Sequence, residues 1–381
     1  MPEQLSLTVV IPTRDRSGML RECLEALLGQ DAPPSQIIVV DDGSTDSTPE
    51  MLGEYGDRVE AIRGEGAGKS LAVNASLSRV RGSLLWIFDD DDVALPSATA
   101  RIMSAFEAKP TAGIAAASFE EVRSTPEGRI GETLQVTDPP PFEKSGLLPL
   151  LLEANCLTGA SLVCRTEAML AINGFDPRLI RSQDYDVAIR LARNCEAVRV
   201  PGGPTYLFRQ HGGVRGTAQD PIAANERRRM WLHYDQMIFT ALHGDLEPEA
   251  YVHEDLEPPN RLRAGLFQRA FVMARRNLWP QVQIDLEAAC AMDRGEPLSD
   301  AARQSIRRMA VDQAYYGGGG LGDDPAAMRQ VVSGLEGPVA KEVRREIAMA
   351  IARGVAGEVM AGRIGGRRRL HSAAIALTAK T

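Results

Sequence analysis

The amino-acid sequence predicts an α/β domain, in which helices flank a mostly parallel sheet, followed by an α-helical C-terminal domain. Three observations support this prediction. Short runs rich in Val, Ile and Leu alternate with segments of helical periodicity in the N-terminal quarter of the chain. Two of these runs end in aspartates, as expected where strands deliver side chains to one edge of a sheet. Beyond about residue 221 long amphipathic patterns replace the strands.

The expected strands are short apolar runs, the first of which is closed by Pro12. They cover residues 7–12, 37–40, 59–62 and 84–88. Between them apolar residues recur at helical spacing, and Gly29 marks the end of the first such segment. The expected helices cover residues 19–28 and 70–81, and another begins at Ser47 or Thr48 before Pro49. This alternation places the carboxyl ends of the strands along one edge of the sheet.

The C-terminal part is expected to consist of amphipathic helices interrupted by proline and glycine. The helical patterns cover residues 226–242, 262–277, 282–292, 301–314 and 326–361. We expect an α/β domain over residues 1–220, a helical domain over 221–316, a glycine-rich linker over 317–325, and a terminal helical unit with a basic tail over 326–381.

Composition indicates an ordinary globular protein. The 381 residues are 44% hydrophobic and 25% charged, and the net charge of −8 argues against a general nucleic-acid binder. No apolar run is long enough for a membrane span, and no basic and apolar leader begins the chain. The five cysteines are scattered and odd in number, so we expect reduced thiols in a cytoplasmic protein.

An acidic run, residues 89–92, directly follows the apolar run at 84–88. Four adjacent carboxylates repel one another unless water or a cation offsets their charge. Strand alternation would turn Asp89 and Asp91 to one side and Asp90 to the other. Oxygen ligands at a strand's carboxyl end suit Mg²⁺ or Mn²⁺, which bind substrate phosphates. The alternative is a solvated acidic turn.

Three motifs together resemble the signatures of family 2 glycosyltransferases. They are residues 10–16 (VIPTRDR), 39–46 (VVDDGSTD) and 88–92 (FDDDD). The similarity continues through residues 159–165 (GASLVCR), 173–176 (NGFD), 182–186 (SQDYD) and 208–211 (FRQH). The resemblance implies the GT-A fold and metal-dependent transfer of a sugar, with inversion, from a nucleoside-diphosphate-sugar to an acceptor hydroxyl.

The resemblance also implies a role for each matching residue. The nucleoside would be contacted by Pro12, Thr13, Asp15 and Asp42. The rest of the donor would be contacted by Lys69, Asp89 and Asp90, and the metal, Mg²⁺ or Mn²⁺, would be held by Asp89, Asp91 and His211. Asp184 stands where the family keeps the general base that takes the proton from the acceptor hydroxyl.

Other interpretations of these residues stay open. The four aspartates leave the register of the metal-binding pair uncertain by one residue. Without the resemblance, Asp42 is equally a turn or helix-capping residue, and Asp184 a charged residue in a first helical turn. The family often has glutamate before the base, where this sequence has Gln183. A lone histidine such as His211 is more often a surface or packing residue.

Three rival functions can be weighed from the sequence. Residues 64–70 (GEGAGKS) resemble a phosphate-binding P-loop, but Arg63 stands where that motif needs glycine. A nucleotidyltransferase of related fold typically has a glycine-rich loop after the first strand, and residues 12–16 contain no glycine. A catalytically silent nucleotide-sugar-binding protein would not be expected to retain Asp89, Asp91 and Asp184 together.

Several properties are not specified by the sequence. The donor is expected to be UDP-, GDP- or dTDP-linked, but its base, its sugar and the acceptor hydroxyl are not readable, nor is the oligomeric state. The C-terminal end is basic over residues 363–370 and mildly apolar to residue 377. Such a tail is usually solvated or packed against a partner, and it is also compatible with contact to an anionic membrane.

Overall fold

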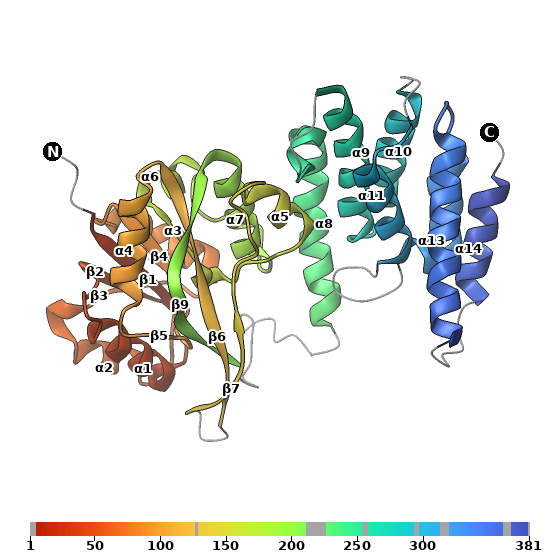
Figure 1. Cartoon of the computed structure of the whole chain (residues 1–381). Coiled ribbons are helices and arrows are strands. Elements are labelled where there is room, and N and C mark those ends of the chain that lie inside the picture. The colour runs from red at the N-terminus through yellow and green to blue at the C-terminus, as the bar shows by residue number, and fades with distance from the viewer. Residues whose placement is uncertain are drawn as a thin grey trace. The chain divides into compact units, whose positions relative to one another are not determined.

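The structure is a computed structural model of the chain. It describes residues 5–125, 129–210, 226–253, 258–292, 297–312, 320–360 and 367–379. The chain forms two compact units (Figure 1). The first comprises Met1–Leu151 and Asn155–Ala223, and the second comprises Leu152–Ala154 and Ala224–Thr381.

The first unit is built on one mixed sheet, whose strand order is β3-β2-β1-β4-β8-β6-β9-β5, with β7 paired to β6. The strands are β1 (Leu7–Thr13), β2 (Gln36–Asp41), β3 (Glu60–Arg63), β4 (Leu84–Ile87), β5 (Val93–Ala94), β6 (Ala112–Ser124), β7 (Ile130–Thr137), β8 (Leu162–Arg165) and β9 (Glu196–Gln210). The first four strands are parallel, and β8 lies antiparallel to both β4 and β6. The expected mostly parallel arrangement therefore holds for the N-terminal half of the sheet.

Helices cover both faces of this sheet (Figure 1). They are α1 (Ser17–Leu28), α2 (Thr48–Gly53), α3 (Lys69–Ser76), α4 (Ala98–Ala108), α5 (Leu148–Glu153), α6 (Thr166–Ala171) and α7 (Gln183–Asn194). On one face, Val9 and Trp86 share a buried core with Leu24 of α1 and Phe106 of α4. On the other, Ile87 lies beside Val187 of α7 around a small cavity. Burial on both faces explains why β1, β2 and β4 are continuous apolar runs.

The helix expected over residues 70–81 ends at Ser76 and continues only as a 3₁₀ turn, Leu77–Arg79. The hydroxyl of Ser76 donates to the carbonyl of Val73 at 2.7 Å, a local bond that competes with helix extension. The strands at 7–12, 37–40, 59–62 and 84–88 are present, with bounds shifted by one or two residues.

The second unit is helical. Its helices are α8 (Arg227–Asp245), α9 (Pro258–Ala274), α10 (Trp279–Ala291), α11 (Asp300–Val311), α12 (Pro325–Ser333), α13 (Ala340–Met360) and α14 (Arg367–Thr378), with 3₁₀ turns at Pro248–Tyr251 and Leu321–Asp323. The helical unit expected to begin at residue 326 contains two helices, α12 and α13, before residue 361. Gly337, between them, has a φ of 104° and lies against the backbone of Cys290, so neither a helix nor a side chain fits there.

The C-terminal segments expected to be a linker and a basic tail are only partly described. Residues 313–319 and 361–366 lie outside the described residues. Asp324 caps α12 by accepting from the N–H groups of Ala326 and Ala327. Arg369 of the expected tail pairs with Asp323 and with Glu358, each at 2.6 Å. No helix among the described residues is long and apolar enough to cross a membrane.

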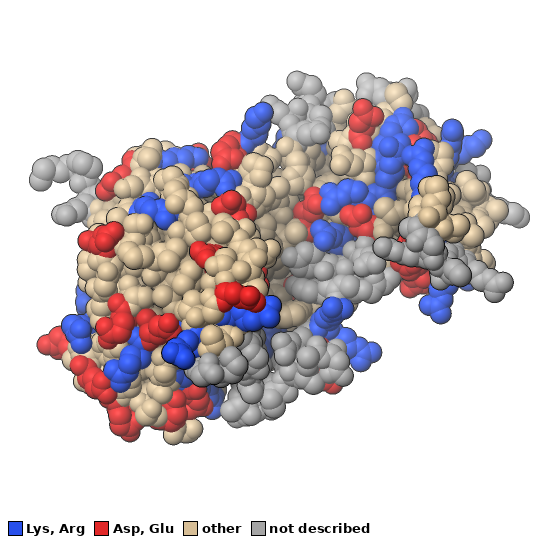
Figure 2. Space-filling model, turned by 60° about the horizontal axis from the view of Figure 1, so that its bottom comes forward, with Lys and Arg blue, Asp and Glu red and all other residues tan. Residues whose placement is uncertain are grey.

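Acidic and basic side chains are interspersed on one face of the first unit. On the face drawn in Figure 2, acidic and basic side chains of this unit alternate over its surface. This distribution agrees with the net charge of −8, and it contrasts with the basic stripe typical of a nucleic-acid binder.

Glu153, at the end of α5, belongs to the second unit and is held by side chains of that same unit. Its carboxylate accepts from Arg308 at 2.5 Å and from Gln268 at 3.2 Å, and it lies 3.3 Å from Nε2 of His253. Burial acts to raise the pKa of Glu153, but the hydrogen bonds from His253 and Arg308 outweigh it and lower the pKa to about 2. The ionised form of Glu153 therefore stabilises the folded unit.

We predict that Glu153→Gln lowers the free energy of unfolding at pH 7 by about 1–3 kcal/mol, because Arg308 loses its charged acceptor. The folded pKa lies below the ordinary value of 4.5, so this contribution is present above pH 4.5 and is lost as the pH falls toward 2. Urea unfolding of the whole chain at several pH values measures it. The exposed Glu336→Gln is the control, and a difference between wild type and Glu153→Gln that does not shrink on acidification would contradict this account.

Candidate active site

The acidic run forms a turn at the carboxyl end of β4. The N–H of Asp92 donates to the carbonyl of Asp89 at 3.2 Å, so the strand has already ended. Asp90 and Asp92 are buried, with 5% and 1% of their surface exposed. The side chains of Asp89 and Asp91 stay accessible, at 30% and 13%. The turn therefore presents two carboxylates outward and keeps two inside.

The inward carboxylates are anchored by neighbouring elements. Asp90 accepts from the hydroxyl of Thr13 and from Arg16, both at 2.7 Å. Asp92 accepts from the backbone N–H of Arg209 at 3.0 Å, and its other oxygen has no hydrogen-bond partner among the described residues. Burial raises the pKa of Asp90 to about 6 against the opposing effect of Arg16, and it raises the pKa of Asp92 well above its ordinary value.

Two arginines, to which the sequence analysis gave no role, hold this turn. Arg16 contacts Asp91 at 3.0 Å as well as Asp90. The buried Arg209 donates from Nε to the carbonyl of Asp91 at 2.8 Å and from Nη2 to Glu22 at 2.5 Å. Arg16 lies in the motif at 10–16 and Arg209 in the motif at 208–211. The need of four aspartates for nearby cations is the signal that could have identified them.

Lys69, the first residue of α3, joins two of the predicted site residues. Its Nζ donates to Asp89 at 2.8 Å and to Asp184 at 3.1 Å. Burial lowers the pKa of Lys69, but the charges of Asp184 and Asp89 outweigh this and raise it above the ordinary value. Three segments that are distant in sequence thus meet at one ammonium group.

Asp184 lies in the first turn of α7, and backbone packing restricts where its carboxylate can go. A Cβ added at Gly159 would lie 3.0 Å from the carboxylate, so a larger residue there would press on Asp184. The residue that precedes the helix, Ser182, has a φ of 58°. The segment before α7 is tied to α3, because Asn74 exchanges two hydrogen bonds of 2.8 Å with the backbone of Phe175. The helix that carries Lys69 and the segment that leads to Asp184 are therefore fixed to each other.

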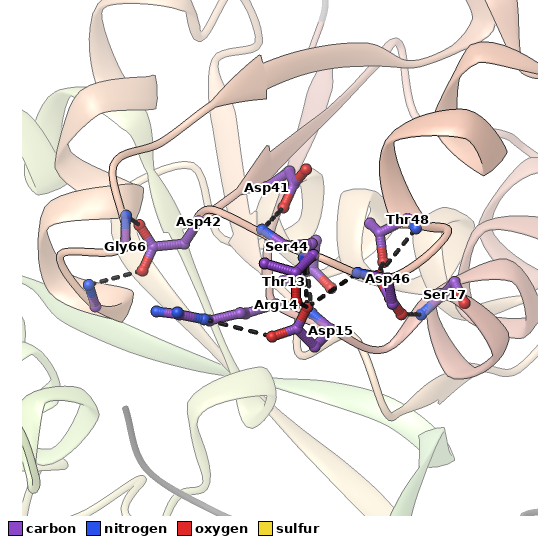
Figure 3. Close-up of polar contacts among 12 residues, drawn as sticks. Thr13, Arg14, Asp15, Ser17, Asp41, Asp42, Ser44, Asp46, Thr48 and Gly66 are labelled. Carbon is purple, nitrogen blue, oxygen red and sulfur yellow. Dashed lines mark hydrogen bonds and ion pairs between the residues drawn. The ribbon is translucent and has the colours of Figure 1, made fainter. Parts of the chain in front are cut away.

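Asp15 lies in the loop after β1, which packs against the turn after β2 (Figure 3). Its carboxylate accepts from the N–H of Thr45 at 2.6 Å, and its own N–H donates to the hydroxyl of Ser44 at 2.9 Å. The hydrogen bond from Thr45 lowers the pKa of Asp15. These contacts connect the motif at 10–16 with the motif at 39–46.

Asp42 accepts three backbone hydrogen bonds from the glycine-rich loop (Figure 3). The N–H groups of Gly66, Ala67 and Gly68 lie 2.9, 3.0 and 2.7 Å from its carboxylate oxygens. In a P-loop these N–H groups would face a phosphate. Here a carboxylate of the protein binds them, which argues against the phosphotransferase alternative. The contact of Asp42 with a base stays a prediction.

The structure thus brings most of the predicted site residues to one edge of the sheet. Pro12 and Thr13 end β1 beside Asp42, and Thr13 links this side to Asp90. Asp89, Asp91, Lys69 and Asp184 form the other side. His211, the remaining predicted metal ligand, lies outside the described residues.

The accessible carboxylates fit a divalent metal that is completed by a substrate. Among the described residues, no group of three or more His, Cys, Asp or Glu is placed to hold a metal alone. Asp89 and Asp91 offer oxygen ligands at an accessible edge, and Mg²⁺ and Mn²⁺ commonly use one or two carboxylates together with phosphate oxygens and water.

Comparison with known proteins assigns this region to a family. Residues 8–169 match the sequence model of the family described as glycosyl transferase family 2. The chain carries a family 2 glycosyltransferase domain. The resemblance found in the sequence is thereby confirmed, and the matched residues include the strands β1 to β4 and the acidic turn.

Curated relatives of this glycosyltransferase domain cover only part of the chain. Glycosyltransferase GlyA of Streptococcus pneumoniae is 35% identical over 89 residues, which are 23% of this chain and 13% of the relative. The putative glycosyltransferase EpsH of Bacillus subtilis is 27% identical over 138 residues, which are 35% of this chain and 40% of the relative. The chain thus spans less than half the length of either protein.

Solved structures resemble a larger share of the chain. TarS 1-349 from S. aureus in complex with UDP has a TM-score of 0.51 at 15% identity and covers 94% of this chain and 92% of that chain. The mannosyltransferase PcManGT from Pyrobaculum calidifontis, in complex with GDP-Man and Mn²⁺, has a TM-score of 0.50 and covers 99% of this chain and 86% of that chain. These likenesses confirm the expected GT-A-like fold with a helical C-terminal region.

We predict that Asp42→Ala lowers the free energy of unfolding by about 1–3 kcal/mol, because three N–H groups of the glycosyltransferase domain lose their acceptor. Urea unfolding measures the change, with the exposed Asp57→Ala as the matched control. Equal stability of the two variants would show that water replaces the Asp42 carboxylate without cost.

Proposed function

We propose that the chain transfers a sugar from a nucleoside-diphosphate-sugar to an acceptor hydroxyl, with inversion at the anomeric carbon. One observation carries the proposal. Asp89 of the acidic turn and Asp184 of α7 contact the same Lys69 nitrogen, so the metal-binding and base positions of the family motifs lie close together. In such a pair, Asp89 can bind the metal that contacts the donor phosphates, and Asp184 can accept the proton of the acceptor hydroxyl.

Asp184 is proposed as the general base. Inverting transfer in one step needs a carboxylate that takes the proton of the acceptor hydroxyl as its oxygen attacks the anomeric carbon. Asp184 is held at the accessible edge by the hydrogen bond from Lys69, which restricts its orientation, and Gly159 leaves room for its carboxylate. A fixed base near the attacking oxygen accelerates transfer because less orientational freedom is lost in the transition state.

Asp89 and Asp91 are proposed to hold Mg²⁺ or Mn²⁺. The bound metal would supply positive charge that stabilises the departing nucleoside diphosphate. Arg16 and Arg209 fix the turn on which both carboxylates stand, so the turn is preorganised for that ligand. His211 is retained in the proposal as a third ligand.

The nucleoside is proposed to bind at the edge formed by Pro12, Thr13, Asp15 and Asp42, with Lys69 and Asp90 on the diphosphate side. The donor would be a UDP-, GDP- or dTDP-linked sugar. The TarS and PcManGT complexes, which contain UDP and GDP-Man, support a nucleotide-linked sugar as the donor. All five cysteines are free thiols, which supports a reducing compartment such as the cytoplasm.

We predict that Asp184→Asn and Asp91→Ala separate transfer from donor binding. Asp184→Asn should lower the rate of transfer by about 10²–10⁴-fold and leave donor affinity nearly unchanged, because only the base is lost. Asp91→Ala should weaken metal-dependent donor binding. Calorimetric titration of the donor with Mn²⁺ measures the donor affinity of both variants. An equal loss of donor affinity in the two variants would undo this division of roles.

The donor's base can be found before any acceptor is known. We predict that one of UDP, GDP and dTDP, with Mn²⁺, raises the midpoint of thermal unfolding by several degrees, since ligand at a hundred times its Kd adds about 2.7 kcal/mol. Asp91→Ala should lose this shift. A shift produced by ATP and by none of the diphosphates would favour a nucleotidyl- or phosphotransferase instead.

A further inference from the structure

Both accessible carboxylates of the acidic turn are already paired with basic side chains. Asp91 contacts Arg16 at 3.0 Å, and Asp89 contacts Lys69 at 2.8 Å. These positions are the ones assigned to the metal by the proposed function. A metal that binds there must therefore compete with a cation of the protein.

The two basic partners are held differently. Arg16 also binds the buried Asp90 at 2.7 Å, so its guanidinium is anchored beneath the turn. Lys69 bridges Asp89 and Asp184, whose side chains are each 30% exposed. Lysine carries a compact charge on a flexible stem of four carbons. Of the two cations, Lys69 is the one that can leave its partner without uncovering a buried charge.

An ammonium group and a divalent metal cannot share the same oxygen of Asp89 without strong repulsion. The Lys69 nitrogen lies within hydrogen-bond distance of that oxygen, and a coordinated Mg²⁺ or Mn²⁺ would carry two further positive charges at a still shorter distance. A metal on that oxygen therefore requires a shift of Lys69, and a metal on the other oxygen of Asp89 still places both cations on one carboxylate, which favours an additional anion.

We propose that Lys69 holds the place of the metal in the ligand-free protein and makes metal binding depend on a diphosphate. The inference rests on the proposed function, in which the donor's diphosphate binds beside Asp89. The diphosphate offers Lys69 another anion within reach of its side chain, and Asp89 then becomes available to the metal. The metal and the diphosphate thus bind together. Until both are present, the ammonium group of Lys69 offsets the negative charge of the Asp89 carboxylate.

The backbone around Lys69 supports a movement confined to the side chain. Ser70 donates to the carbonyl of Leu179 at 3.2 Å, and Asn74 is bonded to the backbone of Phe175. Gly68, immediately before Lys69, donates to Asp42 at 2.7 Å. These contacts fix the start of α3 on both sides, so the ammonium group can change partner while the helix stays in place.

Mn²⁺ titrations followed by the electron paramagnetic resonance signal of free Mn²⁺ test this inference. They are done on the full chain, without nucleotide and with the nucleoside diphosphate that raises the unfolding midpoint. Wild type should bind Mn²⁺ weakly alone and at least about tenfold more tightly with the diphosphate. Lys69→Met should bind Mn²⁺ alone about threefold to tenfold more tightly than wild type, because Asp89 loses its competing cation.

Two variants serve as controls. Lys109→Met removes one positive charge from the surface of the same unit, where Lys109 pairs with Glu196, and should bind Mn²⁺ as wild type does. Lys69→Arg keeps a cation beside Asp89 and should keep Mn²⁺ binding weak without nucleotide. Circular dichroism checks that each variant is folded.

The outcomes distinguish this inference from the proposed function. If Lys69→Met binds Mn²⁺ alone no more tightly than wild type, while Asp91→Ala abolishes diphosphate-dependent binding, the place-holding role of Lys69 is wrong and the metal site stands. If wild type does not bind Mn²⁺ with any of the diphosphates, the metal site of the proposed function is wrong, and this inference fails with it.

Discussion

The constraint on which the first unit depends is the crowding of carboxylates at the end of β4. Asp90 and Asp92 are buried next to two accessible aspartates, and burial penalises each charge. Basic residues from three separate elements contact the turn. They are Arg16 before α1, Lys69 at the start of α3 and Arg209 in β9. The acidic turn is therefore stabilised by contacts from elements that are far apart in the sequence, which links the site to the folding of the sheet.

The acidic turn has buried contacts that fix its conformation and an accessible ion pair that can be exchanged. Buried contacts, those of Asp90 with Thr13 and of Asp92 with the backbone of Arg209, are sheltered from water and hold the loop in one conformation. The accessible pair of Asp89 with Lys69 is screened by solvent and is worth less, so it can be exchanged for another ligand. A rigid support under an exchangeable outer face suits a site that must bind and release a charged substrate.

Local patterns predicted the elements that depend on neighbouring residues. The apolar runs predicted β1, β2 and β4, and the acidic run at the end of β4 indicated the edge at which the site lies. Long-range contacts were not predictable in the same way. Arg209 lies 117 residues from Asp92, and nothing in its local sequence says which carboxylates it will meet. The break between α12 and α13 was also missed, because it depends on the approach of Gly337 to the backbone of Cys290.

The glycine-rich loop connects the two sides of the site. Asp42, directly after β2, binds the N–H groups of Gly66, Ala67 and Gly68, and the next residue is Lys69. Gly68 has a φ of 95°, so the chain turns sharply there into α3. A carboxylate that fixes this turn also fixes the point from which Lys69 reaches Asp89 and Asp184.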